Sequence, residues 1–254
     1  RTNIRLLGVG GTGHEGADLT DSMLVISVAA DGTDALMLSL PRDIWIPSMQ
    51  AKLNTAFYYG EQNQPGTGGM TLAKAAVSEV IDKPIHYGVL LDFHGFVKLV
   101  DTLGGIEVDV ENAFTDDKYP IPGKENAQPE SARYETISFT SGPQIMDGQT
   151  ALKFVRSRNA VGAEGTDLAR SQRQKRVISA IQNRLIDTNV ILNRSKLEDI
   201  YTVIKDSIAM DIPTDVWPAF IRLGTQVKPD SVRTLAFPIY LETEGSNAAT
   251  PQEA

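Results

Sequence analysis

Short apolar runs typical of β-strands alternate with helix-like segments along most of this 254-residue chain. Strand-like runs occupy residues 3–9, 22–29 and 34–40, whereas residues 71–81 and 94–103 show the periodicity of amphipathic helices. A chain that alternates strands with helices folds as a sheet with helices on both faces, because both apolar faces of the sheet must be covered. The pattern predicts an α/β fold around a central sheet.

The rest of the chain continues this alternation, apart from two polar stretches. Residues 111–135 carry three prolines and no clear periodicity, so we expect a long loop there. Residues 242–254 are small and polar, so we expect a flexible tail after a single domain over residues 1–241. The other expected strands are residues 85–92, 106–110, 135–140 and 232–237, and the other expected helices are residues 52–60, 148–157, 167–185, 196–207 and 214–227.

The composition excludes some functions. The formal net charge is −8, whereas a general nucleic-acid-binding protein needs a basic surface. The chain has no cysteine, which rules out disulfides and thiolate metal ligands. No apolar run reaches the roughly 18 residues that a membrane-spanning helix needs. The composition therefore fits a globular protein.

Residues 153–176 concentrate positive charge against this acidic background. The segment holds seven Lys or Arg residues and only two acids. Arginine is the side chain best suited to planar, multidentate binding of phosphate or carboxylate groups. A run of charges can also be a solvated helix face, so the segment indicates either an anion site or an exposed helix end. The basic residues are Lys153, Arg156, Arg158, Arg170, Arg173, Lys175 and Arg176.

The expected helix over residues 167–185 has one face that starts polar and ends apolar. Residues three or four positions apart share a helix face, so the polar front end and the apolar far end lie on one stripe. Such a face suits a site for a phosphate with an apolar tail behind it. The alternative is that the first two turns simply project into water. The stripe consists of Asp167, Arg170, Gln174, Ile178, Ile181 and Leu185.

A glycine-rich loop follows the first strand. Gly8, Gly10 and Gly13 match the G-x-G-x-x-G pattern of dinucleotide-binding proteins, which would indicate a nicotinamide-dependent oxidoreductase. That pattern requires a helix directly after the loop, whereas residues 22–29 read as a strand, so we disfavour it. We expect instead that the glycines let the backbone approach a ligand closely.

Two charged residues stand where this part of the chain enters or leaves a strand. Asp21 follows the glycine-rich loop and is a candidate Mg²⁺ ligand, since Mg²⁺ takes one or two carboxylates together with phosphate and water. A turn-capping role is the alternative for Asp21. Arg42 follows a strand and Pro41, where it can reach a ligand beyond the sheet edge; the alternative is a surface ion pair with Asp43.

Eight short motifs resemble, in the same order, those of the LytR–CpsA–Psr family. The resemblance spans residues 3–185. It implies a three-layer α/β/α sandwich with a central mixed β-sheet and a lipid-binding tunnel. The motifs lie at residues 3–8, 19–23, 39–43, 52–56, 103–108, 146–152, 156–158 and 167–174.

The resemblance also implies an activity and a location. Family members transfer a glycopolymer, such as a teichoic acid or capsule, from a polyprenyl-pyrophosphate carrier to a cell-wall acceptor, usually peptidoglycan. They use Mg²⁺, for which Mn²⁺ is the expected substitute, and pyrophosphatase activity is a second expectation. We therefore expect a bacterial phosphotransferase on the extracytoplasmic face of the membrane, anchored by a segment upstream of residue 1.

The resemblance assigns roles to the candidate residues. Asp21 would hold Mg²⁺, and Asp167 would orient arginines or assist deprotonation of the acceptor. Phe96, Ile178 and Ile181 would line the tunnel for the prenyl chain. The residues expected around the pyrophosphate are Arg42, Arg156, Arg158, Arg170 and Gln174.

Two positions depart from the family pattern. Gly10 stands where members often carry Asp, and Leu19 where they often carry Arg. His14 or Asp18 could compensate for these changes. The departures keep a second hypothesis open, in which the chain is a polyprenyl-phosphate-binding module of the cell envelope without turnover.

Overall fold

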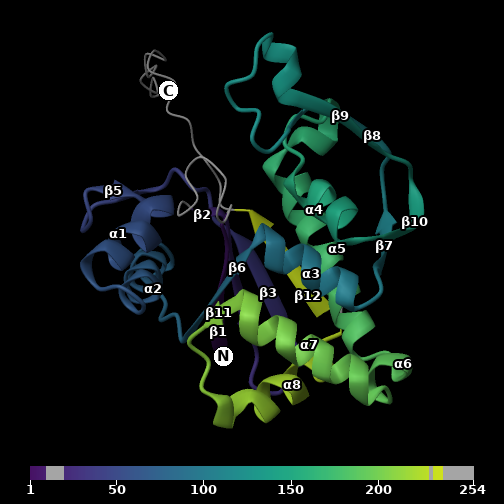
Figure 1. The fold of residues 1–254 in the computed structure, drawn as a ribbon. Coiled ribbons are helices and arrows are strands. Elements are labelled where there is room, and N and C mark those ends of the chain that lie inside the picture. The colour runs from purple at the N-terminus through teal and green to yellow at the C-terminus, as the bar shows by residue number, and fades with distance from the viewer. Residues whose placement is uncertain (10–19, 229–230, 237–254) are drawn as a thin grey trace, which may run out of the picture.

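The computed structural model describes residues 1–9, 20–228 and 231–236. Its main sheet has the strand order β11-β6-β1-β2-β3-β12. Strand β1 runs parallel to β6, and β3 parallel to β12, whereas the other neighbours are antiparallel, which confirms the expected central mixed sheet (Figure 1). The strands are β1 (Thr2–Val9), β2 (Thr20–Val28), β3 (Ala35–Ser39), β6 (Tyr87–Asp92), β11 (Ile208–Met210) and β12 (Val232–Ala236).

Helices cover both faces of this sheet, which confirms the three-layer arrangement. Helices α1 (Ala56–Asn63) and α2 (Gly68–Ile81) lie on one face, with α3 (Phe93–Thr102), α5 (Asp167–Leu185) and α7 (Arg194–Ser207) on the other (Figure 1). Of the described helices, none is long and apolar enough to cross a membrane.

Each helical layer builds its own apolar core. On the first face, Leu7 and Met23 of the sheet pack with Ala73 and Val77 of α2. On the second face, a larger cluster joins α3, α5 and α7 to the small outer sheets, with Phe154 and Val177 among its buried members. The main sheet thus separates two cores, and the candidate site lies where its strands β2 and β3 meet the second helical layer.

Helix ends fall where the sequence places capping residues. Thr166 Oγ1 accepts a hydrogen bond from Ala169 N at 3.1 Å, so α5 begins at Asp167 as predicted. Asp147 caps helix α4 (Gly148–Arg156) in the same way. Gly148 is required there, since a Cβ would lie 2.3 Å from the carbonyl oxygen of Val97 on α3. The remaining helical elements are η1 (Leu53–Thr55), η2 (Glu130–Arg133), η3 (Gly162–Gly165), α6 (Thr188–Ile191), η4 (Thr214–Val216) and α8 (Trp217–Gln226).

The prediction of a loop over residues 111–135 is wrong for residues 114–120. Strand β8 (Phe114–Pro120) lies within it and pairs antiparallel with β9 (Tyr134–Phe139). On β8 the buried positions are Phe114, Asp116 and Tyr119, so one inward position is acidic and the apolar alternation is hidden. The register also shifts between Asp116 and Tyr119, which breaks the two-residue period further. The other short strands are β4 (Trp45–Ile46), β5 (Ala51–Lys52), β7 (Ile106–Val110) and β10 (Gly142–Met146).

A tight turn joins β2 to β3. Gly32 adopts a φ of 71°, which favours glycine, and Thr33 Oγ1 donates to Asp31 Oδ1 at 2.8 Å. The predicted tail at residues 242–254 lies outside the described residues.

Candidate anion-binding site

Two adjoining hollows form one groove beside the ends of β2 and β3. One measures about 500 Å³ and the other about 630 Å³. Ser22, Arg42, Arg158 and Arg170 line both hollows, so the two are lobes of a single groove centred on three arginines. The first lobe is completed by Met23, Ser39, Leu40, Pro41, Asp43, Asp167 and Gln174, and the second by Phe93, Tyr119, Pro120, Val155, Arg156 and Asn159.

The groove brings together every residue predicted to surround the pyrophosphate. Arg42 comes from the segment after β3, Arg156 and Arg158 from the end of α4, and Arg170 and Gln174 from α5. These three segments are far apart in sequence. Guanidinium groups that converge on one hollow favour binding of a phosphate-like anion.

Arg42 is fixed through its backbone and lies beside an acid. Its carbonyl oxygen accepts a hydrogen bond from Asn54 N at 3.1 Å. Its Nε lies 3.4 Å from Asp43 Oδ2, so Arg42 forms the surface ion pair that was considered as the alternative. Arg42 lines the groove as well. A hydrogen bond from Lys52 holds the pKa of Asp43 below its usual value, so this acid is ionised beside Arg42 at neutral pH.

Arg156 is braced by two aromatic rings. Its guanidinium carbon lies 4.0 Å from the centroid of Phe93 and 5.6 Å from that of Tyr119. Arg156 Nη1 also donates to the Tyr119 hydroxyl at 3.3 Å. Burial raises the pKa of Tyr119, so the phenol stays neutral and its own proton is available for donation.

The polar front end of α5 faces the groove, as the functional interpretation of its stripe predicted. Arg170 Nη2 lies 2.8 Å from Asp167 Oδ1. Gln174 is buried, and its Oε1 has no hydrogen-bond partner within the described part of the chain. An unpaired buried amide oxygen carries a desolvation cost that a bound hydroxyl or water would relieve.

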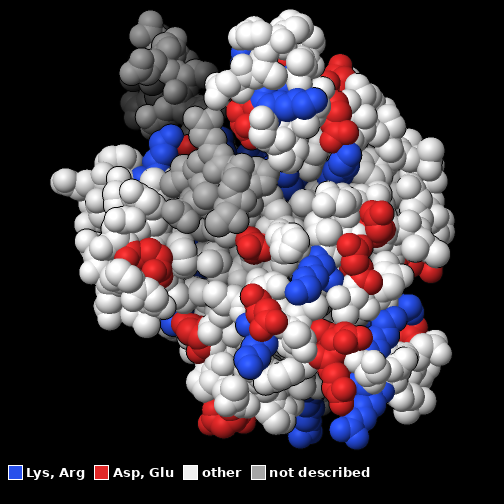
Figure 2. All heavy atoms as spheres, in the orientation of Figure 1, with Lys and Arg blue, Asp and Glu red and all other residues white. Residues whose placement is uncertain are grey.

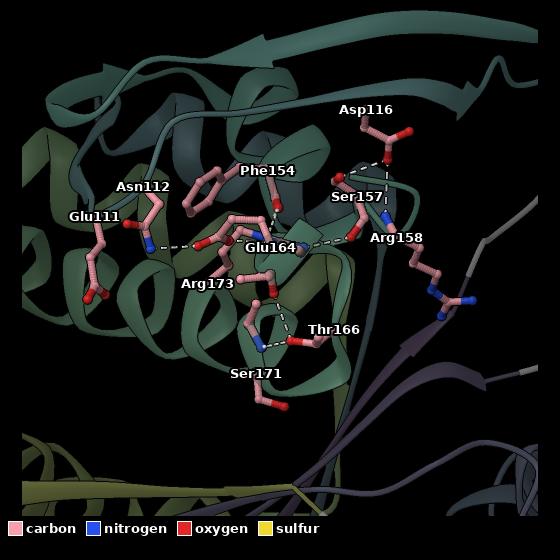
Figure 3. A network of polar contacts seen from close by, with 12 residues as sticks. Glu111, Asn112, Asp116, Phe154, Ser157, Arg158, Glu164, Thr166, Ser171 and Arg173 are labelled. Atoms are coloured by element: carbon pink, nitrogen blue, oxygen red, sulfur yellow. Dashed lines mark hydrogen bonds and ion pairs between the residues drawn. The ribbon is translucent and has the colours of Figure 1, made fainter. Parts of the chain in front are cut away.

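Arg173, counted in the basic segment, belongs instead to the interior. Only 1% of its surface is exposed. Its Nη1 lies 2.8 Å from Glu164 Oε2, and its Nε donates to the Phe154 carbonyl oxygen at 3.1 Å (Figure 3). Burial lowers the pKa of Arg173, and Glu164 partly offsets this. Part of the positive charge in residues 153–176 is therefore structural.

The three residues expected to line a lipid tunnel lie outside both lobes of the groove. Phe96 and Ile181 are partly buried and pack against the larger apolar core. Ile178 is half-buried on α5 and lies one turn beyond Gln174. Their role towards a prenyl chain stays a prediction.

Asp21, the candidate metal ligand, lies at an irregularity in the pairing of β1 with β2. Gly8 pairs with Ser22 and Val9 with Thr20, so Asp21 is the extra residue at a shift in the register of β1 and β2. The Asp21 side chain is outside the described part of the structure, as are Gly10, Gly13, His14, Asp18 and Leu19. Within the described residues, no group of three or more acidic or histidine side chains is placed to hold a metal ion.

The next described element after the glycine-rich stretch is a strand. Residue Thr20 begins β2, which pairs with β1 and continues to Val28. The dinucleotide-binding unit joins two parallel strands through a helix, so the antiparallel pairing of β1 with β2 argues against that hypothesis.

Several groove residues were not recognisable from the sequence. Phe93, Tyr119 and Asn159 line the second lobe, Ser39 lines the first, and Ser22 lines both. Tyr119 lies in the segment expected to be a loop. Tyr119 could have been recognised only from the pairing of residues 114–120 with the predicted strand at 135–140, and a local sequence pattern does not reveal such pairing.

The molecule is therefore a three-layer α/β/α protein with an arginine-lined groove beside one end of its sheet. The model of the LytR_cpsA_psr family matches residues 1–252, and the chain belongs to this family.

Curated relatives share this family over part of their length. A polyisoprenyl-teichoic acid–peptidoglycan teichoic acid transferase TagU of Oceanobacillus iheyensis is 29% identical over 218 residues, which cover 84% of this chain and 59% of that protein. A cell wall biosynthesis protein LcpA of Corynebacterium glutamicum is 26% identical over 220 residues, which cover 78% of this chain and 39% of that protein. The chain thus spans about three-fifths or less of the length of these relatives.

Solved structures share the fold. The crystal structure of TagV from B. subtilis superposes with a TM-score of 0.66 at 23% identity, covering 96% of this chain and 88% of that chain. TagT bound to LI-WTA superposes with a TM-score of 0.63 at 23% identity, covering 96% and 82%.

Proposed function

We propose that this chain transfers a glycopolymer, such as a teichoic acid or capsule, from a polyprenyl-pyrophosphate carrier to peptidoglycan. The observation that carries the proposal is the convergence of Arg42, Arg158 and Arg170 from three separate segments on one groove. Membership of the family and relatives named as teichoic acid transferases support it. The domain would act on the extracytoplasmic face of the membrane, held there by an anchor elsewhere in the protein.

The arginines would bind the pyrophosphate and stabilise the charge that develops on the leaving lipid phosphate. Phosphoryl transfer needs little covalent help from the protein, so positioning and charge neutralisation provide most of the catalysis. Arg156, whose guanidinium is held against Phe93, would provide a fourth fixed positive charge at the second lobe. Donors fixed before the reaction stabilise the transition state without reorganising.

Asp167 would act on the acceptor. It lines the first lobe, and its side chain is 54% exposed although it pairs with Arg170. A half-exposed carboxylate at the mouth of the groove can accept the proton of an incoming sugar hydroxyl, while Arg170 keeps it oriented.

Mg²⁺, or Mn²⁺ in its place, would be held by Asp21 together with phosphate oxygens and water. One carboxylate with substrate phosphate is a normal ligand set for Mg²⁺, and the described residues offer no larger acidic cluster. When bound, the ion would neutralise phosphate charge as a Lewis acid.

The prenyl chain would pass between the main sheet and the second helical layer. The sheet face opposite the α1 and α2 layer carries apolar residues that belong to neither core, and they are only half-buried. Apolar side chains left half-exposed inside a three-layer fold favour a bound hydrocarbon. These residues are Ile4, Leu6, Ile26, Val89 and Leu91, with Phe96, Ile178 and Ile181 on the helical side.

The direct test is an assay of transfer from a polyprenyl-pyrophosphate-linked glycopolymer to peptidoglycan, in which the release of polyprenyl phosphate is measured. Arg158→Ala should reduce transfer by roughly 30- to 1000-fold, because it removes a charge-assisted contact to the transition state. Arg176→Ala is the control, since Arg176 belongs to the same basic segment but pairs with exposed Glu111 outside the groove. Lipid binding without product, even with metal, would favour the non-catalytic binding module instead.

A further inference from the structure

Arg156 is the last residue of α4, and Arg158 lies in the irregular connection that follows this helix. Helix α4 ends at Arg156, and η3 begins only at Gly162. Arg156 and Arg158 both line the groove, so their direction depends on how this short connection is held. A loop that must aim charged side chains needs fixed points outside itself.

The first fixed point is the carboxylate of Asp116 on β8. Asp116 is completely buried, with 0% of its surface exposed. Its Oδ2 accepts hydrogen bonds from Ser157 Oγ at 2.7 Å and Arg158 N at 3.1 Å (Figure 3). It also accepts one from Asn159 N at 3.1 Å. Its Oδ1 accepts from Lys118 N at 3.0 Å. A buried carboxylate satisfied by neutral donors holds those donors strongly, because losing any of them leaves charge uncompensated.

The second fixed point is Arg173, which holds the same segment from the opposite side. Arg173 Nη2 donates to the Ser157 carbonyl oxygen at 2.8 Å, and its Nη1 to the Glu164 carbonyl oxygen at 2.8 Å (Figure 3). Ser157 is therefore held by its hydroxyl on the β8 side and by its carbonyl on the α5 side.

Strand β8 also holds a guanidinium directly. Tyr119, three positions after Asp116, accepts the hydrogen bond from Arg156 Nη1 and stacks against that side chain. The same strand thus fixes the backbone of Arg158 and the side chain of Arg156.

We propose that Asp116 is a positioning residue, which acts through the backbone of residues 157–159 to aim Arg156 and Arg158 at the anion. This role rests on the proposed function, because the anion it serves is the pyrophosphate of the carrier. Asp116 itself does not line the groove, so its effect must pass through the groove residues that it holds in place.

The test measures binding of inorganic pyrophosphate by calorimetry to the wild type and to Asp116→Asn. The amide keeps the shape of the side chain but loses the charge and one acceptor oxygen. We expect affinity to fall roughly 10- to 100-fold, because small displacements of catalytic groups have effects of this size. Asp117→Asn is the matched control, since Asp117 is the next residue and is exposed. It should bind as the wild type does.

A second comparison separates positioning from general loss of structure. In the background of Arg156→Ala with Arg158→Ala, Asp116→Asn should weaken residual pyrophosphate binding less than about twofold, because the groups it positions are absent. An undiminished effect in that background would overturn the positioning role. Ser157→Ala removes one of the three donors to Oδ2 and should weaken binding by a smaller factor, with partial recovery in Ser157→Thr. This serine series tests the positioning role by itself if Asp116→Asn does not fold, and unchanged binding in Ser157→Ala would then overturn it.

The outcomes distinguish this inference from the proposed function. Equal affinity in Asp116→Asn and Asp117→Asn, with a binding-competent wild type, would overturn the positioning role alone. A wild type that neither binds pyrophosphate nor transfers glycopolymer would overturn the proposed function and the positioning role with it.

Discussion

Individual arginines have different roles in this protein. Arg158 and Arg170 line the groove, Arg173 ties helix α5 to the end of α4, and Arg5 lies buried in β1. Only the surroundings separate these roles, because a guanidinium can donate hydrogen bonds to carbonyl oxygens as well as to phosphate oxygens. Mutations of arginine in this chain should therefore divide into effects on binding and effects on stability.

Arg5 offers a test on the stability side. It is 0% exposed, and none of its three side-chain nitrogens has a hydrogen-bond partner in the described part of the chain. Burial lowers the pKa of Arg5 to about 9, well below the usual pKa of an arginine side chain. The lowered pKa of a base disfavours its charged form in the folded state, so the cost is fully present below pH 9 and declines above it.

Arg5→Leu should raise the free energy of unfolding by about 1–4 kcal/mol, since replacing a buried charge with an apolar side chain of similar volume is commonly stabilising. Chemical denaturation at pH 7 measures this gain, which should shrink as pH rises above 9. Arg233→Leu is the control. Arg233 pairs with Asp34 at the surface, so its loss should change stability by less than about 1 kcal/mol. A stability loss in Arg5→Leu would show that the charge is compensated.

Asp21 offers a test on the metal side. Asp21→Ala should raise the Mg²⁺ concentration needed for half-maximal transfer, because a carboxylate ligand is removed. Asp43→Ala is the comparison, since Asp43 lies in the groove but already pairs with Arg42 and Lys52. Identical Mg²⁺ dependence in the wild type and in Asp21→Ala would exclude Asp21 as a ligand.

At the scale of elements, helix α5 joins the groove to the second core. Its first turns supply Asp167, Arg170 and Gln174 to the groove, and its later turns pack Val177 and Ala180 into the core. Packing of α5 against the core therefore fixes the position of Arg170 in the groove. Ile178, one turn beyond Gln174, is half-buried and does not belong to this core cluster.

The pair Ile178→Phe and Ile181→Phe tests whether a prenyl chain passes along this helix. Ile181 packs against the core, so the larger ring should lower stability by about 1–3 kcal/mol. Ile178 is half-buried outside that cluster, so the ring should leave stability unchanged and weaken polyprenyl-phosphate binding. Thermal unfolding and lipid binding, measured on both variants, decide this. Unchanged lipid affinity in both variants would show that the prenyl chain does not pass along α5.

At the scale of the whole molecule, the groove joins parts of the fold that pack in different cores. Arg42 follows β3, whose Leu38 packs with the α2 layer, whereas Arg158 and Arg170 belong to the opposite layer. Acidic and basic side chains are interspersed over the face shown in Figure 2, in keeping with the net charge of −8. The groove is thus a local concentration of positive charge on an acidic protein.

A ligand that bridges these layers should stabilise the fold as a whole. Inorganic pyrophosphate at 100 times its Kd should raise the free energy of unfolding by about 2.7 kcal/mol, because it binds only the folded state. Added salt should reduce the effect by screening the groove charges. Thermal unfolding with and without pyrophosphate measures this. The same shift in the double variant Arg158→Ala with Arg170→Ala would place the anion elsewhere.

Local sequence patterns determined much of this fold. The apolar periods of β1, β2 and β3 and the start of α5 at Asp167 agree with expectation, because alternation, helical spacing and capping act over a few residues. The concentration of arginine in residues 153–176 also pointed to the groove, since net charge within a short segment is visible without a structure.

Only the tertiary structure decided which charged residues face the groove and which are buried. Arg170 and Arg173 stand three positions apart in one basic run, yet one lines the groove and the other lies in the interior. Asp116 and Tyr119 gained their roles through the pairing of β8 with β9 and through contact with residues 157–159. The physical reason is that burial of a charge depends on partners distant in sequence, whereas local patterns record only the spacing of apolar side chains.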